Sequence, residues 1–124
     1  MKITLETIEN FTDQEVFDFV CKHLLEQGRQ CSDGRNPLYK RYNEEGKLLL
    51  SAIGCMMADS YRDRMEGTTI GFLIPIFYAQ EIVSEEKIQL LKRLALLHNH
   101  AIYWDRIPES LKFFAERYGL EYNL

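Results

Sequence analysis

Residues 11–28 read FTDQEVFDFVCKHLLEQG, and this stretch carries the clearest structural signal in the chain. Thr12 and Glu15 have the spacing of a capping box, in which each side chain bonds a backbone N–H at the start of a helix. Apolar residues then recur at helical spacing, and Gly28 is a typical helix stop. We therefore predict a helix over residues 13–27. Its predicted core residues are Phe17, Val20 and Leu24.

Two further helices are predicted toward the C-terminus. Ser84 is a good N-cap, and the acidic residues after it suit the first turn of a helix. The last helix follows Asp105, tolerates Pro108 in its first turn and ends at Gly119. The apolar faces of these two helices are formed by Ile88, Leu91, Leu94, Ala95 and Leu97, and by Ile107, Leu111, Phe114 and Tyr118.

The segments between the helices have extended or turn character. Residues 38–42 and 47–53 are predicted strands of a hairpin whose loop ends in Gly46. Residues 1–11 are predicted to be an N-terminal arm or an edge strand. A short helix, capped by Asp59 or Ser60, is predicted over residues 61–65, and irregular, buried chain over residues 68–80. The predicted fold is α+β, with three main helices packed against a small antiparallel β-hairpin or sheet, in a single globular domain of residues 1–124.

Composition limits the classes of protein to which this chain can belong. Its 124 residues are 46% hydrophobic and 27% charged, which is typical of a globular domain. No apolar run approaches the roughly 20 residues of a membrane helix, and the N-terminus lacks the pattern of a signal peptide. The three cysteines form no C-x-x-C pair, so we predict free thiols and a cytoplasmic location.

Charge is distributed unevenly along the chain. Residues 1–27 carry six acidic and two basic residues, and the remainder is balanced, so the net charge of −4 comes from the N-terminal end. Non-specific nucleic-acid binding requires a basic surface that displaces counterions. We therefore predict neither nucleic-acid binding of that kind nor membrane association.

The residues that could carry chemistry are few and scattered. The cysteines and histidines do not have the spacing of a zinc site, and no glycine-rich phosphate loop is present. The histidines are expected to cap helix ends or face water. We predict no metal, no cofactor and no enzymatic activity. A minor enzyme, with Cys31 or Cys55 paired to His98, remains the alternative.

Tyrosine and arginine residues gather in the hairpin and the segment after it, and these residue types anchor many protein interfaces. The alternative is that the tyrosines lie half-buried with their hydroxyls in water. The predicted partner-binding residues are Tyr39, Arg41, Tyr61, Arg62 and Arg64.

The order of several short motifs resembles a family of small uncharacterised proteins from bacteria, phages and prophages. The matching segments are HLLEQG at residues 23–28, Tyr39-Lys40, SAIGC at residues 51–55, Asp59, Tyr61, Glu66-Gly67, the helix that ends at His98, Trp104 and Gly119-Leu120. The chain departs from the family pattern at Leu38 and Ser51, where the family often has cysteines, and at Asn99, where it has aspartate. A metal or disulfide built on those positions is therefore excluded here.

These observations favour a small cytosolic protein-interaction module. The resemblance favours a phage or other mobile element as the source, and it implies no activity of its own. Together with the missing catalytic constellation and the Tyr/Arg-rich candidate surface, it leads us to predict a protein that binds and inhibits a host protein such as a defence nuclease. A third interpretation is a homo-oligomeric structural or regulatory protein, such as a homodimer, with the apolar segment Phe72–Tyr78 as its self-interface.

Overall fold

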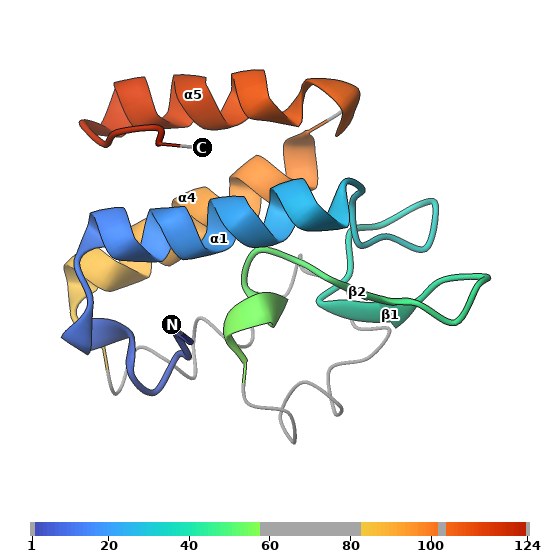
Figure 1. Cartoon of the computed structure of the whole chain (residues 1–124). Helices are drawn as coiled ribbons and strands as arrows, with labels where there is room; N and C mark the ends of the chain where they lie inside the picture. The colour runs from blue at the N-terminus through green and yellow to red at the C-terminus, as the bar shows by residue number, and fades with distance from the viewer. Residues whose placement is uncertain (1, 58–82, 102–103, 124) are drawn as a thin grey trace.

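The computed structural model describes residues 2–57, 83–101 and 104–123 (Figure 1). Within these residues, three helices contact one another: α1 (Asp13–Gln27), α4 (Glu85–His100) and α5 (Ile107–Tyr118). An antiparallel hairpin of β1 (Lys40–Tyr42) and β2 (Leu48–Leu50) lies beyond the C-terminal end of α1 (Figure 1). The predicted α+β fold, with three main helices and a small antiparallel hairpin, is confirmed.

Helix α1 begins and ends where its local sequence predicts. The Thr12 hydroxyl accepts from the Glu15 N–H at 3.1 Å, and the Glu15 carboxylate accepts from the Thr12 N–H at 3.0 Å. Gly28 has a φ of 71°, a left-handed conformation that glycine adopts without strain. The helix buries one face, which includes all three predicted core residues: Val16, Phe17, Val20, Cys21 and Leu24.

Helices α4 and α5 form a hairpin that covers α1. The Ser84 hydroxyl caps α4 by accepting from the Lys87 N–H at 3.3 Å, and the Lys87 ammonium lies 2.6 Å from the Asp13 carboxylate at the start of α1. Phe17 of α1 and Phe114 of α5 stack with their ring centroids 5.4 Å apart. The residues buried from α4 are Ile88, Leu90, Leu91, Leu94, Ala95 and His98, and those from α5 are Ile107, Leu111, Phe114 and Ala115.

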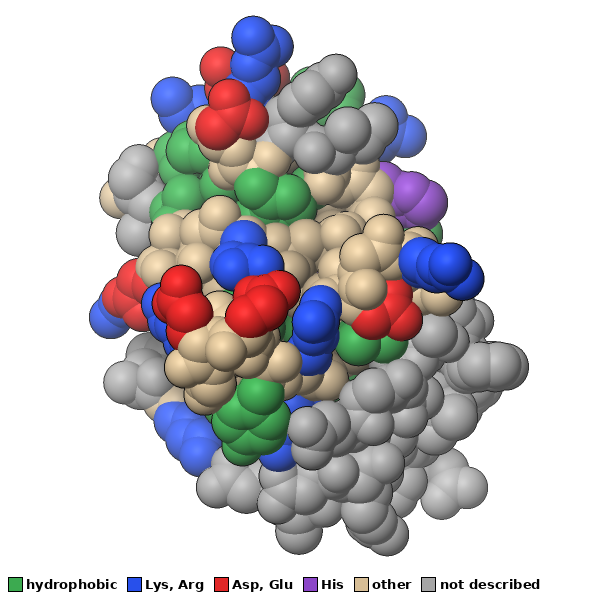
Figure 2. Space-filling model, turned by 90° about the vertical axis from the view of Figure 1, so that its right-hand side faces the viewer, with side chains coloured by type: hydrophobic (Ala, Val, Ile, Leu, Met, Phe, Trp, Pro, Cys, Tyr) green, Lys and Arg blue, Asp and Glu red, His purple; other side chains and the backbone are tan. Residues whose placement is uncertain are grey.

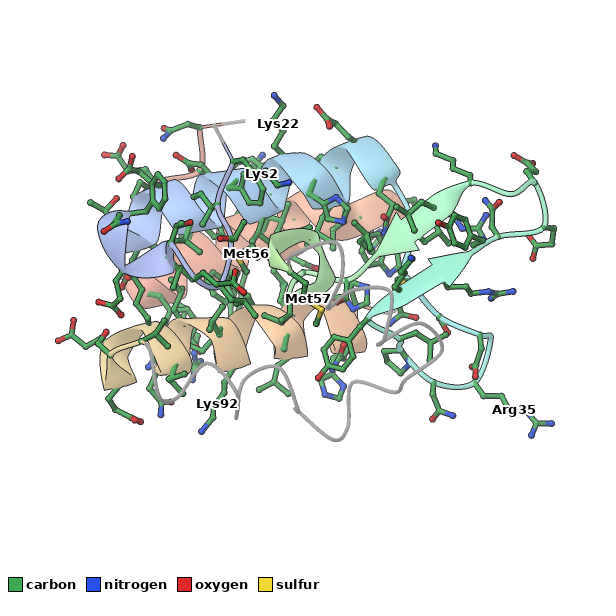
Figure 3. The ribbon with its side chains drawn as sticks, turned by 90° about the horizontal axis from the view of Figure 1, so that it is seen from below. Lys2, Lys22, Arg35, Met56, Met57 and Lys92 are labelled. Carbon is green, nitrogen blue, oxygen red and sulfur yellow. The ribbon has the colours of Figure 1, made fainter. Side chains whose placement is uncertain are left out.

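The β-hairpin is attached to α1 by polar side chains. Gln27 accepts a hydrogen bond from the Leu50 N–H through Oε1 at 2.8 Å and donates one from Nε2 to the Leu50 carbonyl at 2.9 Å. These bonds satisfy backbone groups of β2 that would otherwise face outward as a free strand edge. After β2 the chain turns into a short 3-10 helix, η2 (Gly54–Met56), which lies below α1 in Figure 1, and Met56 and Met57 are buried (Figure 3).

The N-terminal residues form an arm that packs into the core. A turn at residues 4–7, in which the Thr7 N–H donates to the Thr4 carbonyl at 3.1 Å, is followed by the 3-10 helix η1 (Ile8–Asn10). The side chains of Ile3, Leu5 and Ile8 are buried. The edge-strand alternative is therefore wrong, because the turn interrupts the alternation that a strand requires.

Several predictions fall outside the described residues. They are the short helix at residues 61–65, the irregular chain at residues 68–80 and the self-interface at Phe72–Tyr78. Among the helices that the structure describes, none combines the length and the apolar character needed to cross a membrane.

Candidate functional site

The predicted tyrosine–arginine surface is not assembled by the described part of the chain. Tyr39 is 0% exposed and belongs to the main core cluster, so its prediction as a partner contact is wrong for this conformation. The error arises because the residue precedes β1, where the chain lies against Gly54 of η2 and the Tyr39 carbonyl accepts from the Ser51 N–H at 3.1 Å. Arg41 is half-buried and donates from Nη1 to the Ser32 carbonyl. Tyr61, Arg62 and Arg64 lie outside the described residues.

The proposed cysteine–histidine pair does come together, but not as a nucleophile and its base. The backbone N–H of Cys31, not its thiol, donates to His98 Nε2 at 3.1 Å. The thiol donates to the Leu49 carbonyl at 3.3 Å, and burial raises the pKa of Cys31 to about 12. A thiol in this environment stays protonated at neutral pH, so it is not an activated nucleophile. Cys55 is also buried, and its thiol donates to the Ala52 carbonyl at 3.1 Å.

His98 is a structural residue at the centre of this region. It is 0% exposed, which corrects the expectation that it caps a helix end or faces water. Burial lowers its pKa to about 4, while the bond between Nδ1 and Asn99 Oδ1, at 3.1 Å, acts in the opposite direction. Since Nε2 accepts the Cys31 N–H, the proton of the neutral ring lies on Nδ1. The ring also meets Trp104 edge-on, with centroids 5.7 Å apart.

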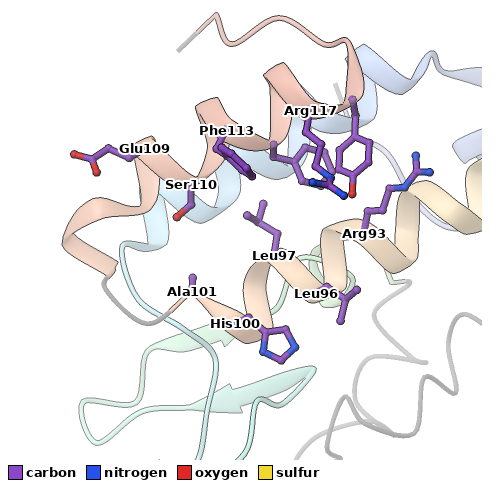
Figure 4. A pocket seen from close by; sticks show the side chains of 11 residues that line it. Arg93, Leu96, Leu97, His100, Ala101, Glu109, Ser110, Phe113 and Arg117 are labelled. Carbon is purple, nitrogen blue, oxygen red and sulfur yellow. The ribbon is translucent and has the colours of Figure 1, made fainter.

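A groove of about 620 Å³ lies between α4 and α5 on the outer side of the helical hairpin (Figure 4). From α4, Leu97 points into this groove, and from α5, Phe113 points toward it (Figure 4). Two of the large apolar side chains that line it face solvent, because Phe113 is 65% exposed and Leu96 is 54% exposed. We name this feature the α4–α5 groove. Its lining residues are Arg93, Leu96, Leu97, His100, Ala101, Glu109, Ser110, Phe113, Phe114, Arg117 and Tyr118.

The two ends of the α4–α5 groove differ in chemistry. At one end, the guanidinium groups of Arg93 and Arg117 lie 4.3 Å and 5.7 Å from the centroid of the Tyr118 ring. At the other end, near the connection between the helices, lie Glu109 and Ser110 (Figure 4). The groove is therefore cationic at one end, apolar in the middle and polar with a carboxylate at the other end.

The face of the molecule drawn in Figure 2 does not concentrate one sign of charge. Figure 2 shows acidic and basic side chains interspersed over the coloured part of one face. The described residues also hold no cluster of three or more His, Cys, Asp or Glu side chains that could bind a metal ion. The α4–α5 groove is thus the described feature that best combines an open apolar surface with charged groups.

The sequence carries a weak signal for the groove. Phe113 lies outside the apolar stripe of its helix, and Leu96 lies outside the stripe of α4. A large apolar residue on the polar face of an amphipathic helix marks a surface that is able to bind a partner. Single residues of this kind are common, however, and only the pairing of the two helices places them along one groove.

Comparison of the chain with protein-family models, with curated proteins and with solved structures finds no match to any of the three. The resemblance to small phage and bacterial proteins accordingly stays a prediction.

Proposed function

We propose that this protein is a small protein-interaction module that binds a partner protein through the α4–α5 groove. The observation that carries the proposal is the exposure of Phe113 and Leu96, at 65% and 54%, along one groove between two well-packed helices. Apolar side chains that line a common hollow provide the anchor points that interfaces use.

The energetic advantage of covering these residues is appreciable. Removing a Phe or Leu side chain from water contributes roughly 1.5–3 kcal/mol when burial is complete. Phe113 and Leu96 are half or more exposed, so a partner that covers both recovers a substantial part of this amount. The helices themselves need no rearrangement, because the opposite face of each is packed in the core.

Binding is favoured over catalysis by the state of the titratable groups near Cys31. The Cys31 thiol and the His98 ring, which were the candidates for chemistry, already bond backbone or neighbouring groups and are held in their neutral forms. The alternative of a Cys–His enzyme therefore receives no support from their geometry.

The proposed setting is the cytosol of a bacterial host. Free, buried cysteines suit a reducing compartment, and all three cysteines are of this kind. The resemblance to phage and prophage proteins supports a host protein as the partner, and inhibition of a defence enzyme as the outcome of binding.

The proposal is tested by affinity capture from bacterial lysate with three forms of the chain. Phe113→Asp introduces a charge into the groove, whereas Tyr42→Asp introduces the same charge at another aromatic residue, 48% exposed, on the hairpin. We expect a stoichiometric protein to be captured by the wild type and by Tyr42→Asp and lost from Phe113→Asp. Circular dichroism of each variant verifies that it is folded.

Capture that is equal for all three forms, or lost only from Tyr42→Asp, would place the interface elsewhere and overturn the proposal. If no captured protein is lost when Phe113 is substituted, the proposal is overturned as well.

A further inference from the structure

The cationic end of the α4–α5 groove contains two arginines on one aromatic ring. Arg93 comes from α4 and Arg117 from the last turn of α5, and both guanidiniums lie within 6 Å of the Tyr118 ring centroid. Contact with the ring face partly orients both groups and lowers the entropy cost of engaging a ligand. Figure 4 shows the two side chains converging from the two helices.

Neither arginine is neutralised by an acidic residue in the part of the chain that the structure describes. The ion pairs found there are Lys87 with Asp13 and Lys22 with Glu26. Among the described residues, the contact that both charges share at this end of the groove is the Tyr118 ring. An anion placed between them would relieve their mutual repulsion and accept charge-assisted hydrogen bonds from both.

The apolar middle of the groove lies directly beside this pair of charges. A ligand that fits the whole groove needs apolar groups opposite Leu97 and Phe113 and an anionic group beside Arg93 and Arg117. It must also avoid placing a negative charge beside Glu109, which fixes its direction along the groove.

We propose that the occupant of the α4–α5 groove is an acidic amphipathic helix of the partner protein, with a carboxylate held by Arg93 and Arg117. This inference rests on the proposed function and specifies its ligand. A groove between two helices accepts a third helix whose apolar residues are spaced three or four positions apart. An Asp or Glu one turn beyond those residues reaches the arginine end.

Two other occupants fit less well. The groove is open enough to leave Phe113 and Leu96 mostly exposed, and a small amphiphile lying in it would keep much of its own surface in water. A second copy of the chain offers less among the described helices, because α1, α4 and α5 turn their apolar stripes inward and the large apolar side chains that α4 and α5 expose, Leu96 and Phe113, already line the groove.

The test uses a display library of helical peptides of about 16 residues, long enough for a helix to form in a groove. One face of each peptide is randomised, and the library is selected on the wild-type chain after depletion on Phe113→Asp. We expect the enriched peptides to carry two large apolar residues three or four positions apart and an acidic residue one turn away.

The strongest peptide and its Glu→Gln or Asp→Asn counterpart are then measured by fluorescence anisotropy. Two charge-assisted hydrogen bonds correspond to a loss of roughly tenfold or more in affinity when Arg93→Gln and Arg117→Gln are combined. The neutral counterpart peptide should bind the wild type and this double variant equally. Arg35→Gln removes a charge from an exposed turn that points away from the helices (Figure 3), and it should change neither affinity.

The outcomes separate the two levels of the proposal. Apolar peptides enriched without an acidic residue, or an acidic peptide insensitive to the arginine substitutions, would overturn the acidic helix and leave the groove as an interface. If no selected peptide depends on Phe113 for binding, both the acidic helix and the groove as an interface are overturned.

Two controls identify the competing occupants. Sedimentation that shows a dimer of the wild type and a monomer of Phe113→Asp would assign the groove to a second copy. Displacement of the strongest peptide by dodecanoate, at concentrations below those at which the peptide itself binds, would assign it to a lipid-like carboxylate. Either result would overturn the acidic helix.

Discussion

Protonation of His98 should destabilise the fold as the pH falls below neutrality. The neutral ring is fully buried, and its Nε2 accepts the Cys31 N–H, so adding a proton there replaces a hydrogen bond by a repulsive contact between two donors. Burial is the main cause that lowers the pKa of His98 from 6.5 to about 4, and the charge of His23 acts in the same direction. The unfolded chain therefore binds this proton more readily than the folded chain.

The sign and size of the effect follow from linkage. Because the pKa of His98 is lower in the folded state, its stabilising contribution is present above pH 6.5 and is lost as the pH falls toward 4. The drop from 6.5 to about 4 corresponds to about 3 kcal/mol in total, of which about 2 kcal/mol is lost between pH 7 and pH 5.

Two carboxylates set the lower limit of the useful range. The pKa of Glu9 is lowered by the backbone N–H of Ser84, and that of Asp33 by the backbone N–H groups of Asn36 and Arg35. Their contributions are present above the ordinary carboxyl pKa values of 4.5 and 3.8 and are lost below them. Between about pH 5 and 7 these two carboxylates stay ionised, so this range separates their effect from that of His98.

The assay compares urea unfolding of the wild type and His98→Gln across this range. Glutamine can accept the Cys31 N–H through its carbonyl but does not titrate, so the variant should lose about 2 kcal/mol of the pH dependence between pH 7 and 5. His100→Gln, which removes an imidazole at an exposed site two residues away, serves as the matched control for the substitution itself. Identical pH profiles for the wild type and His98→Gln would refute the reasoning.

Three further predictions concern stability and reactivity. Gly54→Ala places a Cβ against the Tyr39 carbonyl and should lower the free energy of unfolding by about 2 kcal/mol or more in urea titrations. An unchanged urea midpoint would contradict the close contact. Thr12→Ala removes the acceptor of the Glu15 N–H and should lower it by about 1 kcal/mol, an effect that would be absent if the capping box contributed nothing. Burial raises the pKa values of Cys21 and Cys31 to about 12. A thiol reagent should therefore label the folded protein at least roughly a hundredfold more slowly than the urea-unfolded protein. A thiol that is labelled rapidly in the folded protein would support the Cys–His alternative.

Local sequence was sufficient to place α1, α4 and α5 along the chain, although α5 begins at Ile107, after a 3-10 turn over Trp104–Arg106, and not directly after Asp105. The bounds of α1 follow from the Thr12 cap and the Gly28 stop, and those of α5 from Pro108 and Gly119. These signals act within one or two turns of backbone, because caps and glycine stops satisfy or release groups only a few residues away. The same reasoning applies to α4, which begins after Ser84.

The candidate functional sites could not be placed from local sequence. Tyr39, which was predicted to be a surface contact, is buried. Phe113, which was predicted to lie on a helix but not to bind a partner, is exposed. A tyrosine beside a strand is compatible with either environment, and the segments that cover it decide between them. Of the predicted tyrosine–arginine surface, the structure describes only Tyr39, which is buried, and Arg41, which is half-buried. Tyr61, Arg62 and Arg64 lie outside the described residues, so the remainder of that surface stays a prediction.

The sequence by itself determined the helical stripes, the caps, the hairpin and the absence of a local catalytic motif, because each of these depends on residues close together in the chain. Only the tertiary structure decided that the Cys31 N–H meets His98, 67 residues away, and that Leu96 and Phe113 line one groove with two arginines at its end. The physical reason is that burial and juxtaposition depend on how the apolar stripes of three helices pack together, and that packing brings into contact residues whose own neighbours in sequence carry no record of it.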